Sequence, residues 1–216
     1  MAPVFKYVDQ TVGRLAAKRF VVDPVVAERY SRITSIVSSA YKRHGAILEH
    51  ALVAALTAAP HLQVWSEPQF RVSPAAERLA DDDRTSRDAE LPYGAPDFQR
   101  TLQIDLVVYN RAQKRLGAYE SKRGTGYHDS GKKRSMLRDL RCIQMLLRSY
   151  GVKQHALDVE QSVARMVFFY GTCSVGAPWA LTRADLDDHF GTPVLEIVEV
   201  VNNYFGRKLD GLLAAA

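Results

Sequence analysis

The chain has few cysteines and no long apolar run. Cys142 and Cys173 are its only cysteines, and no CxxC spacing or Cys/His cluster is present, which argues against a zinc or iron–sulfur site. We expect both thiols to be reduced and structural. No stretch approaches the roughly 20 apolar residues that cross a bilayer. The first residues also lack a secretory signal pattern. The sequence therefore predicts a cytoplasmic protein without a membrane span.

The composition is that of an ordinary globular chain, but the charge is distributed unevenly. The 216 residues are 47% hydrophobic and 25% charged, which fits a single domain over 1–216. Residues 100–153 contain 13 Lys or Arg against 4 Asp or Glu, whereas the remainder contains 16 against 20. This basic stretch indicates either a polyanionic substrate or, about as readily, a solvated basic face.

The first half of the chain is predicted to be helical before it becomes extended. Apolar spacing predicts two helical runs and then a strand, over 24–42, 46–58 and 62–70. A break or bend is expected at 43–45. Residues 73–99 are rich in Pro, Asp, Arg and Ser, and predict a long loop with a short helical turn at 75–80. Within this loop, the acidic run 81–83 is interpreted as solvated.

The second half alternates strands and helices. The expected elements are a hairpin of two strands, a long helix, a strand and a final helix, over 102–109, 116–119, 132–150, 163–170 and from 193 onward. The long helix has an apolar stripe formed by Met136, Leu140, Ile143, Leu147 and Tyr150. The stripe of the final helix, formed by Val194, Ile197, Val198 and Val201, could pack on the core or on a partner. We expect helices that cover a small central sheet.

The hairpin brings together three charged side chains. If the turn of the hairpin is centred between Ala112 and Gln113, Asp105 lies opposite Glu120. Lys122 shares the face of Glu120, and Ser121 points to the other face, because strand residues alternate. Two facing carboxylates repel each other unless a cation compensates them. A Mg²⁺ ion held by carboxylates and a substrate phosphate would do so, which indicates a site that cleaves phosphodiesters.

This arrangement resembles the PD-(D/E)xK nuclease superfamily. The resemblance rests on the order of elements, with Asp105 on the second strand and 120–122 (Glu-Ser-Lys) on the third. It implies an α/β fold with a restriction-endonuclease-like core, in which helices flank a small mixed central β-sheet. The core would span about 45–171, with extra helical segments at 24–44 and 182–213.

A literal Pro-Asp pair stands at 96–97 and competes with Asp105 for the acidic position. In the same hairpin register Asp97 would face position 128, beyond the strand, so Asp105 is preferred. A different register, or a bulge near Gly117, would weaken this choice.

The resemblance also implies a catalytic set of Glu49, Asp105, Glu120 and Lys122. Asp105, Glu120 and the backbone carbonyl of Ser121 would bind Mg²⁺, for which Mn²⁺ could substitute. Glu49 stands on the helix before the first strand and would contribute directly or through water, although an exposed position or a local ion pair also explains it. Lys122 would position the attacking water and stabilise developing negative charge.

Basic side chains near the motif are candidates for contacts with DNA phosphates, or alternatively form a solvated face. They are Arg123, Lys132, Lys133, Arg134, Arg138 and Arg141. The loop 124–131, with Tyr127 and His128, is expected beside the site.

The predicted function is a Mg²⁺-dependent DNA endonuclease of the type II restriction kind, acting on double-stranded DNA as a homodimer. The first alternative is a structure-specific repair, recombination or phage nuclease. The second is a non-catalytic DNA-binding protein that has a nuclease-like fold.

Overall fold

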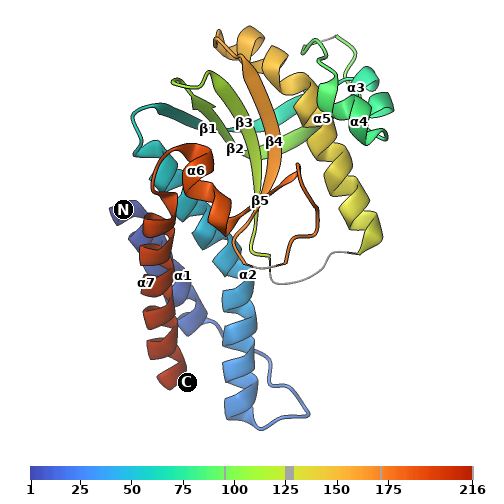
Figure 1. Ribbon diagram of the computed structural model, residues 1–216. Coiled ribbons are helices and arrows are strands. Elements are labelled where there is room, and N and C mark those ends of the chain that lie inside the picture. The colour runs from blue at the N-terminus through green and yellow to red at the C-terminus, as the bar shows by residue number, and fades with distance from the viewer. Residues whose placement is uncertain (95, 125–128, 171, 216) are drawn as a thin grey trace. The chain divides into compact units, whose positions relative to one another are not determined.

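The computed structural model describes residues 1–94, 96–124, 129–170 and 172–215, and its elements are shown in Figure 1. Where the sequence predicts one domain, the structure groups into two compact units. The first comprises Met1–Ala55 and Pro193–Ala216, and the second comprises Leu56–Thr192. Among the helices of the described ranges, none combines the length and the apolar character that crossing a membrane requires.

The first unit contains α1 (Ala2–Ala17), most of α2 (Glu28–Thr57) and α7 (Val194–Ala214). The sequence did not predict α1, whose buried face includes a threonine among valines and a leucine. The ring of Phe5 on α1 lies 4.7 Å from that of Tyr204 on α7, and the Tyr204 hydroxyl donates to Asp9 at 2.8 Å. The apolar stripe of α7 is buried at Val194, Val198, Val201 and Phe205. The stripe therefore packs within this chain.

The predicted break at 43–45 is wrong, because α2 runs through it as one helix of 30 residues. His44 is buried on this helix, its Nε2 lies 2.8 Å from Oδ1 of Asn202, and its ring stacks on Phe205 at 5.2 Å. The polar side chain thus has partners on α7. This packing outweighs the roughly 1 kcal/mol by which glycine disfavours a helix interior at Gly45.

The second unit is built on a five-stranded mixed sheet in the order β1-β2-β3-β4-β5. The strands are β1 (Leu62–Val72), β2 (Arg100–Asn110), β3 (Arg115–Lys122), β4 (Gln161–Phe168) and β5 (Ala180–Thr182). The first three pair antiparallel, whereas β3, β4 and β5 are parallel. Parallel neighbours need a crossover, and α5 (Ser130–His155) provides it between β3 and β4. The very short β5 was not predicted.

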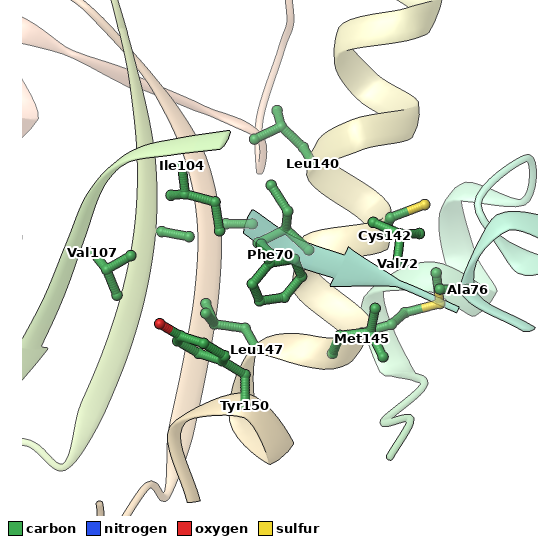
Figure 2. Packing of buried hydrophobic residues seen from close by; sticks show 14 of the residues in the cluster. Phe70, Val72, Ala76, Ile104, Val107, Leu140, Cys142, Met145, Leu147 and Tyr150 are labelled. Carbon is green, nitrogen blue, oxygen red and sulfur yellow. The ribbon is translucent and has the colours of Figure 1, made fainter. Parts of the chain in front are cut away.

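The core of this unit lies between the sheet and α5. Every residue of the predicted α5 stripe is buried, which confirms the helical period. Figure 2 shows Leu140, Leu147 and Tyr150 of α5 gathered around Phe70 of β1, with Ile104 and Val107 of β2 alongside. Cys142 is also buried on α5, and this burial raises the pKa of its thiol to about 12.

Short helices occupy parts of the predicted loop and of the segment after β5. They are α3 (Pro74–Leu79), α4 (Asp83–Asp88), the 3₁₀ turn η1 (Arg183–Asp185) and α6 (Leu186–Phe190). The helical turn expected at 75–80 is confirmed as α3. Helix α4 was not predicted, and it begins where the Asp82 carboxylate accepts from the backbone N–H of Thr85 at 3.0 Å. The acidic run 81–83 therefore includes a helix cap.

The β2–β3 hairpin has the predicted register. Val108 pairs with Gly117 within a regular ladder, so the alternative of a bulge at this glycine is excluded. A Cβ atom at Gly117 would collide with the ring of Tyr119, two residues further along the same face of β3. Glycine is required here to leave room for that ring.

Candidate active site

Asp105 and Glu120 lie one residue beyond the last pair of the hairpin ladder. The ladder runs from Asn110 paired with Arg115 to Leu106 paired with Tyr119. Asp105 and Glu120 are the next residues on the two strands, but the pairing of β2 with β1 shifts register between Val107 and Ile104. That the two carboxylates face each other directly therefore stays a prediction. The competing Asp97 is exposed and lies before β2 begins.

Each of the two carboxylates has a hydrogen-bond partner on its own strand. The ammonium of Lys122 forms an ion pair with Glu120, two residues away on the same face of β3. The Gln103 amide donates to Oδ1 of Asp105 at 3.0 Å, in the same two-residue relation on β2. One carboxylate is therefore paired with a cation, and the other is oriented by a neutral donor.

The two carboxylates line a pocket of about 330 Å³. Strands β2 and β3 form one wall and α5 forms the other. The lining residues are Gln103, Ile104, Asp105, Ala118, Tyr119, Glu120, Asp139, Leu140 and Ile143. The pocket thus brings Asp105 and Glu120 of the hairpin together with three residues of the long helix, whereas Lys122 is not part of its lining.

Asp139 is a carboxylate of this pocket that the sequence interpretation missed. An NH₂ group of Arg100 donates to its Oδ1 at 2.6 Å, and the same guanidinium donates to Glu77 at 2.5 Å. The sequence feature that could have identified Asp139 is its position directly before Leu140, a residue of the apolar stripe. This position puts Asp139 at the edge of the buried face of α5.

The donor set fits a hard divalent cation that retains part of its hydration shell. Within the described ranges, no group of three or more His, Cys, Asp or Glu side chains is placed to hold a metal. Mg²⁺ commonly binds through one or two carboxylates together with waters and substrate phosphates. Asp105 and Glu120 supply two carboxylates beside a pocket with room for such ligands. The carbonyl of Ser121 as a third ligand stays a prediction.

Glu49 belongs to the first compact unit, whereas the pocket belongs to the second. It lies on α2 and is partly buried. Its contribution to the site stays a prediction.

The predicted phosphate contacts fall into two groups. Lys132, Lys133 and Arg134 are exposed in the first turns of α5, which is capped by Asp129 accepting from the N–H of Lys132 at 2.9 Å. Arg123 follows β3, and its guanidinium lies 5.7 Å from the ring centre of Tyr170. Tyr127 and His128 lie outside the described residues.

The other two basic residues hold the short helices against α5. Arg138 forms ion pairs with Glu77 at 2.8 Å and with Asp81 at 2.5 Å. Arg141 forms one with Asp83 at 2.9 Å and donates to the carbonyl of Ala80. These arginines have carboxylate partners within the fold, so a phosphate would have to compete for them.

Tyr119 of β3 forms a neutral pair with a histidine of α6. The Tyr119 hydroxyl lies 2.8 Å from Nε2 of His189 on α6. Burial, together with the positive charges of Arg115 and Arg165, lowers the pKa of His189 to about 3. Burial also raises the pKa of the Tyr119 phenol. Both side chains are therefore uncharged at neutral pH.

This pair predicts a pH dependence of stability. The His189 ring stays neutral in the folded protein down to about pH 3, whereas in the unfolded chain it binds a proton near its ordinary pKa of about 6.5. Between these values the unfolded state binds more protons, so the free energy of unfolding decreases as the pH falls. We expect His189→Gln to remove up to about 1.4 kcal/mol per pH unit from that slope. Urea unfolding from pH 7 to 4 measures it, and parallel curves for the two proteins would contradict the prediction.

Comparison of the chain with protein-family models, with curated proteins and with solved structures finds no match. The assignment of a function therefore depends on the hairpin, the pocket and their chemistry.

Proposed function

We propose that this protein is a Mg²⁺-dependent nuclease that hydrolyses phosphodiester bonds in DNA. The supporting observation is that two carboxylates from the neighbouring strands β2 and β3, Asp105 and Glu120, line the same pocket. Lys122 lies on the same face and is paired with Glu120. Two carboxylates and one ammonium at the edge of a cavity form a site that can hold a cation and a phosphate together.

Each residue has a role that follows from its contacts. Asp105 and Glu120 would hold the cation, which, when bound, polarises the scissile phosphate and lowers the pKa of a bound water. Gln103 keeps Asp105 oriented through its amide. Once a cation takes the Glu120 carboxylate, the ammonium of Lys122 is free to stabilise the charge that develops on the phosphate.

The sheet supports an assignment to the PD-(D/E)xK superfamily, which we include in the proposal. Its strands follow the order that the resemblance implies, with the acidic residues on β2 and β3 and a crossover helix leading into β4. The exposed Lys132, Lys133 and Arg134 offer positive charge for a DNA backbone. Restriction-type cleavage of duplex DNA by a homodimer remains the form of the activity that the sequence predicts.

The decisive experiment is a cleavage assay with the full chain on supercoiled plasmid, linear phage DNA and single-stranded circles. We expect cleavage that requires Mg²⁺ or Mn²⁺ and stops when EDTA is added. Cleavage of circles would show endonuclease activity. Discrete fragments of the phage DNA would indicate sequence specificity, and a smear would indicate a nonspecific or processing nuclease. A folded protein that cleaves no duplex, single-stranded or branched DNA would contradict the proposal.

A further inference from the structure

The pocket contains more apolar wall than a metal ion and a phosphate require. One part of its lining is polar, with Asp105 and Glu120 at the proposed cation site. The other part consists of Ile104, Ala118, Leu140 and Ile143. A hydrated cation and a phosphate gain nothing from contact with aliphatic side chains. Some other, less polar part of the substrate must account for this wall.

We propose that the pocket holds one nucleoside of the substrate, unstacked from its neighbours, on one side of the scissile phosphate. This inference rests on the proposed nuclease function. The volume of about 330 Å³ lies within the range of small-molecule sites, which combine apolar walls with a few polar groups. A nucleobase has an apolar face and a polar edge, and extruded bases are bound between apolar side chains in this way.

Asp139 gives the pocket a preference among bases. Its Oδ1 accepts from Arg100, which compensates its charge without filling the pocket. A carboxylate accepts hydrogen bonds from N–H groups. Cytosine offers its amino group N4, whereas thymine offers only a ring N3–H that lies between two carbonyl oxygens, which a carboxylate repels. The pocket therefore favours an amino-bearing base over thymine.

Entry into the pocket requires an unpaired nucleotide. A base within a duplex must be separated from its partner and its stacked neighbours before it can enter, whereas a base in a single strand is already unpaired. The favoured substrate is therefore a single strand, or a duplex with an unpaired nucleotide at the cleavage point, rather than the fully paired duplex that the sequence predicts.

A set of modified strands tests this inference without altering the protein. Single-stranded oligonucleotides of one sequence each carry one abasic nucleotide, moved stepwise through the strand, and are cleaved in Mg²⁺. We expect that removing the base at one position next to the cut slows cleavage at least about tenfold relative to the intact strand. We also expect the intact sequence to be cleaved at least about tenfold more slowly when this nucleotide is paired in a duplex than when it is single-stranded. Thymine in place of cytosine at this position should also slow the reaction.

A pocket-filling variant adds an independent test. Ile143→Phe should slow cleavage of the intact strand about tenfold, cause little further loss on the strand that is abasic at the sensitive position, and leave Mn²⁺ affinity unchanged. Val152→Phe is the matched control, because Val152 lies on the same helix and is 50% exposed. Should Ile143→Phe fail to fold, the abasic series alone decides.

The two proposals fail in different ways. Metal-dependent cleavage that is insensitive to abasic positions, or equally fast on paired and unpaired strands, would overturn the pocket inference and leave the nuclease function standing. Absence of metal-dependent cleavage on every strand would overturn the nuclease function, and the pocket inference with it.

Discussion

Replacing Glu120 by glutamine is expected to reduce metal-dependent cleavage by roughly 10³-fold, equivalent to about 4 kcal/mol of transition-state stabilisation. The substitution keeps the size of the side chain but removes one of the two carboxylate charges of the hairpin that line the pocket. Asp105 alone would then hold the cation, so Mn²⁺ affinity should also decrease, by at least about tenfold. Single-turnover cleavage and Mn²⁺ binding followed by electron paramagnetic resonance measure the two effects.

Lys122→Met separates binding of the metal from catalysis. Its ammonium pairs with Glu120 and lies where it would compete with a cation for that carboxylate. We therefore expect the variant to bind Mn²⁺ at least as tightly as the wild type, yet to cleave about 10² to 10⁴-fold more slowly. A parallel loss of affinity and rate would contradict the electrostatic role that we assign to Lys122.

Glu160→Gln is the matched control for Glu120→Gln. Glu160 directly precedes β4, is 61% exposed and forms its ion pair with Lys114, away from the pocket lining. Its replacement should leave cleavage and Mn²⁺ affinity unchanged. If Glu120→Gln behaved like this control, the hairpin carboxylates would not form the active site.

The hairpin could be predicted because its geometry follows from local rules. Alternating apolar residues define the two strands, and a turn centred on 112–113 determines which residues face each other. Asp105, Glu120 and Lys122 were found for this reason. Asp139 could not be placed in the same way, because its position depends on how α5 packs on the sheet. A helix pattern shows which face is buried, but not what the edge of that face contacts.

Two further features that the sequence did not predict depend on long-range partners. The break expected at 43–45 did not take account of the partners of His44, because Asn202 and Phe205 are about 160 residues away in the sequence. The ion pairs of Arg138 and Arg141 were not predicted, because their carboxylates lie in a segment that was expected to be a loop. Charge counts along the chain do not reveal which charges are already paired.

The same ion pairs lead to the largest predicted loss of stability, at Glu77 on α3. Its carboxylate is 9% exposed and contacts the guanidinium groups of Arg100 and Arg138 at 2.5 and 2.8 Å. Glu77→Gln removes the one charge that both arginines share. We expect a loss of about 3 kcal/mol in the free energy of unfolding, at the low end of values for breaking a buried pair, because both guanidinium groups are partly exposed. Urea unfolding at pH 7 measures this loss.

Glu90→Gln is the control for this prediction. Glu90 also forms an ion pair with an arginine of α5, Arg148 at 2.8 Å, but the carboxylate is 60% exposed. An exposed pair of this kind contributes less than about 1 kcal/mol. We call Glu77 with Arg100 and Arg138 the Glu77 cluster. Equal losses for the two variants would show that burial and sharing of the Glu77 charge add no stability to this cluster.

The Glu77 cluster also predicts how stability changes in acid. Burial alone would raise the pKa of Glu77, but the hydrogen bonds from Arg138 and Arg100 outweigh it and hold the pKa below its usual value. The contribution of this carboxylate is therefore complete above the unfolded pKa of about 4.3. It decreases as the pH falls from there toward the folded pKa, because the unfolded state then binds more protons. The difference between wild type and Glu77→Gln should accordingly narrow below about pH 4.3, whereas a difference that stays constant in acid would assign the loss to packing rather than to charge.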